Sequence, residues 1–184
     1  KLVRVLSKLN FSFIKVYDRL TPEAYRAVAD ETRRAGMKLE GHVPLTLSPD
    51  DAVDAGQSAI DHLTLILEAC SPGALKATHD AFSAAPEEAD SLSALVSQSV
   101  ADAIAHYDIA SCEPLFARLA AKKVWQIPTF VQLEGYVFPA ELAARDNPLM
   151  SAIPPSSLAE WRAWADEADK GDLRRGRAFL VAQM

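Results

Sequence analysis

Three side chains that can bind a metal ion, Lys15, His42 and His62, lie at or near the ends of successive short apolar segments. Imidazole is the commonest neutral metal ligand in proteins. A lysine amine that adds carbon dioxide becomes a carbamate, which binds metal as a carboxylate does. In an α/β barrel the carboxyl ends of all the parallel strands open onto one face, and that face carries the active site. If the three segments are neighbouring parallel strands, the three side chains converge there.

Each of these residues also has a purely structural interpretation. A lysine within an apolar strand is usually an edge or partly exposed residue, whereas the functional interpretation of Lys15 requires burial that disfavours its charged form. A single histidine at a strand end is more often a hydrogen-bonded polar residue than a metal ligand. The metal-site hypothesis is therefore supported by the order of Lys15, His42 and His62 on consecutive segments. None of these residues supports it alone.

The elements that must position these residues alternate between strand and helix in the first third of the chain. Thr21-Pro22 begins a helix that ends at Gly36, and Ser48 with Asp51 forms the pattern of a capping box before a short helix that ends at Gly56. Such alternation is typical of βαβ units and a parallel sheet. We expect strands at about 11–17, 37–42, 58–63 and 124–130.

A helical insertion at about 67–111 interrupts this rhythm. Its apolar positions between Leu92 and Ile104 recur at helical spacing, and a further helix at about 112–122 leads into the last expected strand. Insertions on the loop face of a barrel often form lids or substrate walls. We expect His79 and His106 to be solvated residues of the helices in this insertion.

The region after residue 130 is rich in proline, and a helix follows it. Ser157-x-x-Glu160 is expected to cap that helix, which carries Trp161 and Trp164 and is interrupted by Gly171. The chain stops at Met184 inside a predicted helix with no strand after it, which is typical of a barrel unit that is cut. We therefore expect one domain over 1–184, with an α/β fold that is a partial (β/α)8 TIM-type barrel of parallel strands with a helical insertion.

The composition limits the partners of this chain. With 19 basic and 25 acidic residues its net charge is −6, which argues against nucleic acid as a partner. No apolar run has the length of a membrane helix, and the first ten residues do not form a signal peptide. The localisation stays undetermined.

The two cysteines, Cys70 and Cys112, lack the spacing of a zinc-binding or redox motif. Two interpretations stay open. They are two small buried apolar residues, or they form a disulfide that closes the long segment between them.

The motifs around the three candidate ligands resemble the amidohydrolase superfamily, above all its imidazolonepropionase-like and prolidase-like members. The motifs that carry the resemblance are Phe13-Ile14-Lys15-Val16-Tyr17, Gly41-His42-Val43-Pro44 and Ile60-Asp61-His62-Leu63, with Pro128-Thr129 in a strand similar to the family's seventh. The resemblance implies a (β/α)8 barrel of which this chain holds about strands four to seven.

The resemblance also implies the role of each matching residue. Lys15 would be carboxylated and bridge two metal ions, and His42 and His62 would be the ligands from the fifth and sixth strands. Tyr17 is a candidate for substrate contact, with a core-facing tyrosine as the alternative. The family's first-strand His-x-His and eighth-strand aspartate have no counterpart here. Asp61 does not replace that aspartate, because strand alternation predicts that it points away from His62.

The activity implied for the intact protein is hydrolysis of a C–N bond, in an amide or a dipeptide-like substrate, by a metal-activated water. The implied cofactor is a divalent metal, with zinc as the first expectation, in a binuclear site. The expected partner is a small-molecule or dipeptide substrate, and a homo-oligomer is open because half a barrel exposes strand edges and apolar faces.

Two alternatives stay open beside the hydrolase. One is a truncated barrel that does not catalyse, since only three of the family's ligands are present. The other is a metal-free barrel in which Lys15 forms a Schiff base, although this leaves His42 and His62 unexplained.

Overall fold

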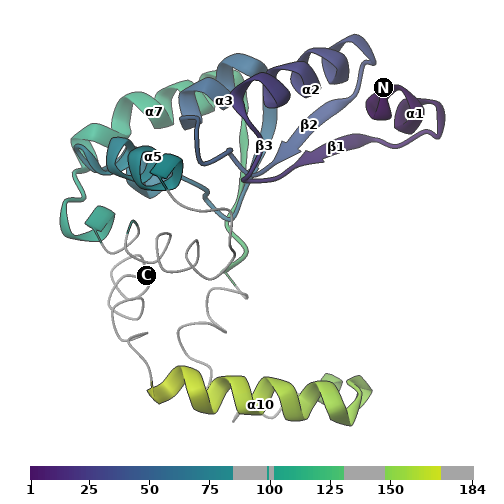
Figure 1. Ribbon diagram of the computed structural model, residues 1–184, viewed down its shortest axis with the longest axis vertical. Helices are drawn as coiled ribbons and strands as arrows, with labels where there is room; N and C mark the ends of the chain where they lie inside the picture. Colours follow the sequence, from purple (N-terminus) through teal and green to yellow (C-terminus); the bar gives the residue numbers. More distant parts are fainter. Residues whose placement is uncertain (85–98, 100–101, 131–147, 171–184) are drawn as a thin grey trace. The chain divides into compact units, whose positions relative to one another are not determined.

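The computed structural model describes residues 1–84, 99, 102–130 and 148–170 (Figure 1). Contacts within the chain separate it into two compact units, Lys1–Pro128 and Thr129–Met184. The sequence predicts one domain over the same residues. In the second unit the described elements are a short 3-10 helix, η1 (Pro148–Ala152), and the helix α10 (Pro155–Lys170).

The first unit contains a four-stranded sheet in which all strands are parallel. Its strands follow chain order, as β1 (Phe13–Val16), β2 (Lys38–Gly41), β3 (Gln57–Asp61) and β4 (Trp125–Ile127). The four expected strands are confirmed, each within a few residues of its predicted bounds. The fold is a mixed α/β arrangement.

The described helices of this unit are α1 (Leu2–Lys8), α2 (Pro22–Arg34), α3 (Pro49–Ala55), α4 (Ile66–Ala69), α5 (Ala74–Ala84) and α7 (Ile109–Lys122). Two of them, α2 and α3, begin where their capping residues predict. The Thr21 hydroxyl accepts a hydrogen bond from the Ala24 amide at the start of α2. Gly56 ends α3 in the left-handed conformation, with φ of 86°.

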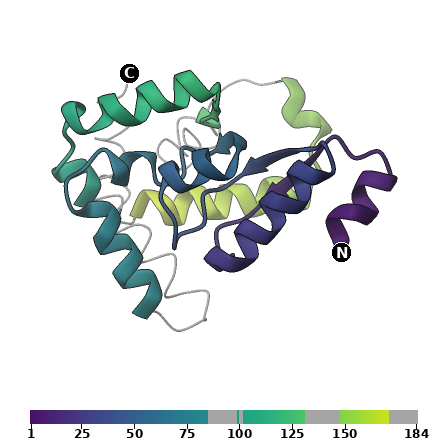
Figure 2. The same cartoon turned by 90° about the horizontal axis from the view of Figure 1, so that it is seen from above.

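The helices α2, α3 and α7 lie along one face of the sheet, as Figures 1 and 2 show. In both views α3 lies between α2 and α7. Apolar side chains from both layers form the core: Ile14, Val16, Leu39 and Ile60 of the sheet, with Tyr25, Ala29, Ala52, Val53, Leu115 and Leu119 of the helices.

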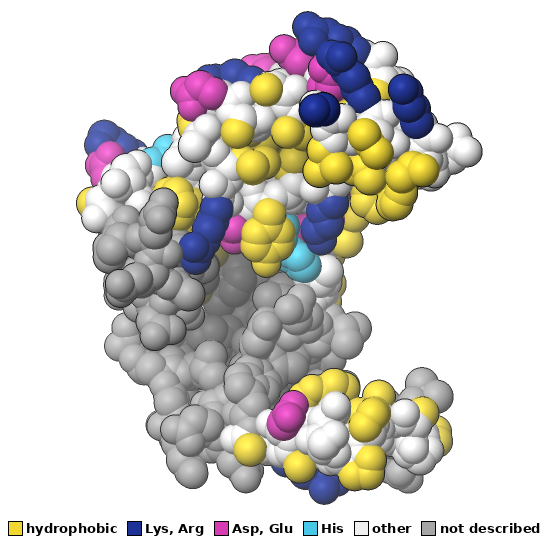
Figure 3. Space-filling view, turned by 45° about the vertical axis from the view of Figure 1, so that its right-hand side comes forward, with side chains coloured by type: hydrophobic (Ala, Val, Ile, Leu, Met, Phe, Trp, Pro, Cys, Tyr) yellow, Lys and Arg dark blue, Asp and Glu magenta, His cyan; other side chains and the backbone are white. Residues whose placement is uncertain are grey.

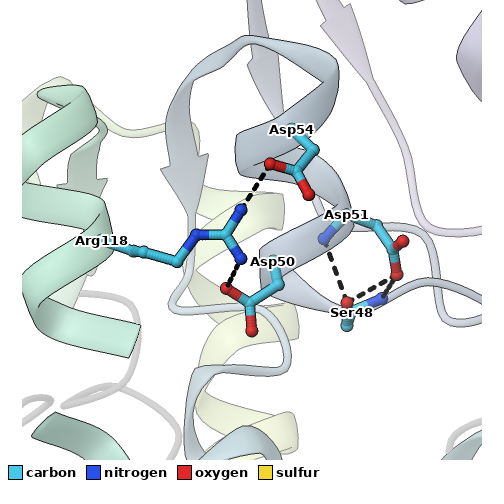
Figure 4. Close-up of polar contacts among 5 residues, drawn as sticks. All are labelled: Ser48, Asp50, Asp51, Asp54 and Arg118. Carbon is cyan, nitrogen blue, oxygen red and sulfur yellow. Dashed lines mark hydrogen bonds and ion pairs between the residues drawn. The ribbon is translucent and has the colours of Figure 1, made fainter. Parts of the chain in front are cut away.

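An arginine joins α7 to α3 at the surface of this layer (Figure 4). The Arg118 guanidinium donates to Asp50, at 2.7 Å, and to Asp54. Figure 4 also shows the capping box of α3, in which the Asp51 amide donates to the Ser48 hydroxyl and the Ser48 amide donates to the Asp51 carboxylate. The side chains of Arg118, Asp50 and Asp54 are largely exposed, so these ion pairs add little to the free energy of unfolding. Their main effect is to orient α7 relative to α3.

The opposite face of the sheet has more exposed apolar area. Paired residues of parallel strands point to one face, so Lys15, Ala59 and Trp125 share this side of the sheet. Phe13, Trp125 and Ile127 are 46%, 76% and 40% exposed. Figure 3 shows hydrophobic side chains gathered on this unit, with basic, acidic and histidine side chains close to some of them.

The two cysteines form a disulfide, which decides between the two interpretations of the sequence. Cys70 follows α4 and Cys112 lies in α7, with 4.6 Å between their Cα atoms, and both are buried. The bond closes a loop of 42 residues, which in the chain-entropy model stabilises the fold by about 4 kcal/mol. The sequence could not show this pairing because two separate helices bring the cysteines together.

Two of the described helices, α4 and α5, lie in the region of the predicted helical insertion, at about 67–111. Most of the apolar face predicted between Leu92 and Ile104 lies outside the described residues. The cap predicted at Ser157 is wrong, because α10 already begins at Pro155 and Ser157 lies inside its first turn. The predicted interruption at Gly171 lies outside the described residues. Among the described helices none is long and apolar enough to cross a membrane.

Candidate metal site

The carboxyl ends of β1, β2 and β3 carry the three candidate ligands. Lys15 is the third residue of β1, and His42 and His62 each follow the last residue of a strand. The His42 amide donates to the Val16 carbonyl of β1, at 3.1 Å, and the His62 amide donates to the Ile127 carbonyl of β4, at 2.8 Å. Both histidines are therefore tied through their backbones to a neighbouring strand.

Lys15 is not the buried, neutral amine that the functional interpretation requires. Its side chain is 50% exposed, and Nζ lies 2.7 Å from Asp61 Oδ2 in an ion pair. This agrees with the structural interpretation of a partly exposed lysine on an edge strand. A carbamate on Lys15 would therefore have to replace this pairing with Asp61.

Asp61 belongs to the site, contrary to what strand alternation predicts for it. It pairs with Ile127 of β4 on the face that also carries Lys15. The alternation rule does not extend from Asp61 to His62, because β3 ends at Asp61 and His62 adopts the left-handed conformation, with φ of 57°. The carboxylate is nearly buried and faces the lysine.

Three aromatic rings meet at the end of β2. The rings of His42 and His62 are arranged edge to face, with centroids 4.9 Å apart. Tyr17 also lies against His42, with centroids 4.2 Å apart and an angle of 30° between the rings. The alternative of a core-facing Tyr17 is wrong, since this side chain is 60% exposed.

The surroundings of His42 favour its neutral form. Burial lowers the pKa of His42 from its ordinary value of 6.5, and the neighbouring His62 and Lys15 also lower it, while the carboxylates of Asp18 and Asp61 oppose this shift. At neutral pH the ring is therefore uncharged, which is the form that binds metal. Its Nε2 atom is buried and has no hydrogen-bond partner among the described residues.

Gly41 lets β1 and β2 approach closely beside these residues. Its φ is 120°, and a Cβ atom at this position would lie 2.3 Å from the carbonyl oxygen of Val16 and 3.2 Å from Cγ of Lys15. A side chain at this position would therefore push apart the strands that carry Lys15 and His42.

A buried hydrogen-bond network supports the end of β2 from the helix side. The Tyr25 hydroxyl donates to Gln57 Oε1, at 2.6 Å, and Gln57 Nε2 donates to the carbonyls of Gly41 and Ala59, each at 2.9 Å. These bonds satisfy polar groups that would otherwise be costly to bury. They also fix the backbone that immediately precedes His42.

The two histidines of the insertion lie elsewhere. The His79 ring is partly buried and its Nε2 lies 3.0 Å from the Leu47 carbonyl oxygen, so the prediction of a solvated residue is wrong for His79. His106 is exposed, and its Nδ1 contacts the Asp102 carbonyl of its own turn. Neither of these contacts involves His42 or His62.

His42, His62 and Lys15 are the residues of this cluster that could hold a divalent cation. In the described part of the chain, no group of three or more histidine, cysteine, aspartate or glutamate side chains could hold a metal ion. His42 and His62 each carry ring nitrogens that could bind a cation, and the buried Nε2 of His42 has no hydrogen bond to the described residues. Lys15 adds an oxygen donor only after it becomes a carbamate.

Sequence reasoning missed Asp18 and misplaced Asp61. Asp18 Oδ2 lies 3.8 Å from His42 Nδ1. The available signal was its position, since Asp18 follows β1 at the same end of the sheet as Lys15 and His42. Carboxylates this close to candidate metal ligands can orient those ligands even when they do not bind the metal themselves.

Comparison with known proteins identifies a shared fold. The structure is similar to that of a bottromycin amidohydrolase, with a TM-score of 0.65 and 23% sequence identity. The likeness covers 98% of this chain and 35% of the other, so the chain spans about a third of that protein's length. No family model matches the sequence, and no curated protein matches it. At this identity the likeness establishes the α/β fold with its parallel sheet.

Proposed function

We propose that this chain is the central part of a metal-dependent amidohydrolase, a hydrolase that cleaves a C–N bond in an amide or peptide-like substrate. The sheet would then be four consecutive strands of a (β/α)8 barrel. Its parallel order, the helices on one face and the likeness to a section of bottromycin amidohydrolase support this. Residues outside these 184 would complete the site.

The observation that carries the proposal is the pair of imidazole rings at the ends of β2 and β3. His42 and His62 lie edge to face on neighbouring strands, and the buried Nε2 of His42 has no hydrogen-bond partner in the described structure. A buried nitrogen without a partner is costly in a purely structural histidine. A bound cation would remove that cost.

Three residues of this chain would hold the cation: His42 and His62 through ring nitrogens, and Lys15 as a carbamate. A bound divalent cation such as zinc supplies an activated water and polarises the scissile carbonyl group. The protein contributes the neutral state of His42, which burial maintains, and the fixed backbone positions of both histidines. The exposed Tyr17 ring, which lies against His42, would contact substrate.

One observation favours a second candidate, a folded module that does not catalyse. The ion pair of Lys15 with Asp61 satisfies both groups without metal or carbon dioxide. On this interpretation the histidine pair is a remnant, and the chain contributes stability or surface to a larger protein.

Metal content separates the two candidates. We expect the 184-residue chain, loaded with zinc and then dialysed against zinc-free buffer, to retain near-stoichiometric zinc by inductively coupled plasma mass spectrometry. The His42→Ala, His62→Ala double variant should retain almost none, because both nitrogen donors are gone.

The matched control is His106→Ala, which removes an exposed histidine whose ring nitrogen contacts a carbonyl of its own turn. It should retain as much zinc as the wild type. Equal zinc in the wild type and the double variant, or no zinc in either, contradicts the proposed metal site and favours the module.

A further inference from the structure

We propose that Asp18 is a positioning residue for His42. Its carboxylate attracts the proton on Nδ1 of the ring, which orients the ring so that Nε2 faces the metal. The part of this inference that concerns metal binding rests on the proposed function. The orientation of the ring is a separate claim that can be tested without metal.

The loop after β1 places Asp18 beside the loop after β2. The backbone carbonyl of Asp18 accepts a hydrogen bond from the Leu45 amide, at 2.9 Å, which ties the two loops together. The side chain of Asp18 is 28% exposed, and that of His42 is 11% exposed. The two groups therefore face each other where little water reaches the ring.

The carboxylate approaches one particular nitrogen of the ring. Asp18 Oδ2 lies 3.8 Å from His42 Nδ1, which is longer than a hydrogen bond but close enough for the carboxylate to attract a proton on that nitrogen. The other oxygen, Oδ1, is buried without a hydrogen-bond partner among the described residues. Asp18 therefore has the capacity to accept a hydrogen bond, and His42 Nδ1 is the ring nitrogen that its carboxylate approaches.

The remaining contacts of the His42 ring leave Nε2 as the atom for a ligand. Tyr17 stacks against its face and His62 meets it edge to face. With Nδ1 turned to Asp18, the buried Nε2 carries the lone pair. Histidines that bind metal usually donate their second ring N–H to a carboxylate or carbonyl, which fixes the tautomer and raises the basicity of the ligand.

The test compares Asp18→Ala and Asp18→Asn with the wild type in two measurements. Long-range ¹⁵N–¹H NMR on the metal-free chain at neutral pH should show His42 protonated at Nδ1 in the wild type. Asp18→Ala should lose this preference, whereas Asp18→Asn should keep it because the amide oxygen still accepts. Zinc affinity, measured by competition with a chromophoric chelator, should fall by about 10–100-fold in Asp18→Ala and by less in Asp18→Asn.

The matched control is Asp30→Asn, which removes an exposed carboxylate that pairs with Arg33 on the surface of α2. It should change neither the tautomer nor the zinc affinity. An unchanged His42 tautomer in Asp18→Ala overturns the inference, and so does a zinc affinity within twofold of the wild type.

If the wild-type chain binds no zinc, the proposed function fails and the NMR result alone decides the inference. An Nδ1–H tautomer that disappears in Asp18→Ala then still upholds the positioning role. If Asp18→Ala does not fold, the Asp18→Asn variant decides, because a role limited to packing predicts no loss of zinc affinity in this nearly isosteric change.

Discussion

The ion pair between Lys15 and Asp61 decides whether this lysine can become a metal ligand. Carbon dioxide adds to an uncharged amine, whereas the Asp61 carboxylate, 2.7 Å from Nζ, pairs with the ammonium form. The same carboxylate would also repel a carbamate at that position. The pairing could not be predicted from the sequence, because it depends on the register of β1, β2 and β3, which brings Lys15 and Asp61 to the same face of the sheet.

We expect Asp61→Asn to increase the carboxylated fraction of Lys15. Because an ion pair of this exposure contributes at most about 1 kcal/mol, the increase should reach no more than about fivefold. The measurement is the carbamate signal in ¹³C NMR of protein equilibrated with ¹³C-bicarbonate, with Lys15→Met to identify the signal. An equal or weaker carbamate signal in Asp61→Asn would show that the ion pair does not limit the reaction.

At the scale of elements, most of the architecture follows from local signals in the sequence. The proline and cap at Thr21-Pro22, the capping box at Ser48 and the stop at Gly56 predicted α2 and α3 nearly to the residue. The failures arise where distant segments meet. The disulfide joins α7 to the end of α4, and the ring of His79 contacts the Leu47 carbonyl. Neither contact can be predicted from the spacing of residues within one segment.

Gly41, the last residue of β2, allows the close packing of β1 and β2 on which the candidate site depends. We expect Gly41→Ala to destabilise the chain by about 2 kcal/mol or more, because a side chain is strained at φ of 120° and its Cβ would overlap the Val16 backbone. Urea unfolding followed by circular dichroism measures the loss. The same variant should bind zinc more weakly, since the strands that carry Lys15 and His42 must move apart.

The control for this prediction is Gly36→Ala. Gly36 also has a positive φ, of 67°, but no atom lies within 4 Å of the place that its Cβ would take. Its cost should be only about 1–2 kcal/mol, with zinc affinity unchanged. Equal effects of the two substitutions would mean that the close approach of β1 and β2 does not matter to the site.

At the scale of the whole molecule, the sheet is covered on one face and exposes apolar side chains on the other. Among the described residues, β1 pairs only with β2 and β4 pairs only with β3, so each outer strand has an unpaired edge. Exposed edges and large apolar side chains such as Trp125 promote association.

We therefore expect the isolated 184-residue chain to self-associate. Sedimentation velocity over an approximately hundredfold range of protein concentration should show a weight-average mass that rises above that of one chain. Trp125→Gln should weaken the association because it removes the most exposed apolar side chain of the sheet. Phe116→Gln, which changes an exposed residue of α7, should not. A compact monomer at every concentration would contradict this view of the open sheet.

The most direct test of the central claim, that Lys15, His42 and His62 form half of a metal site, is zinc K-edge X-ray absorption on the zinc-loaded chain. We predict scattering from two imidazole rings together with oxygen ligands, reduced to one ring in His42→Ala and in His62→Ala. The control His106→Ala should leave the spectrum unchanged. A zinc shell of oxygen ligands alone, or one that neither histidine substitution alters, would contradict the account.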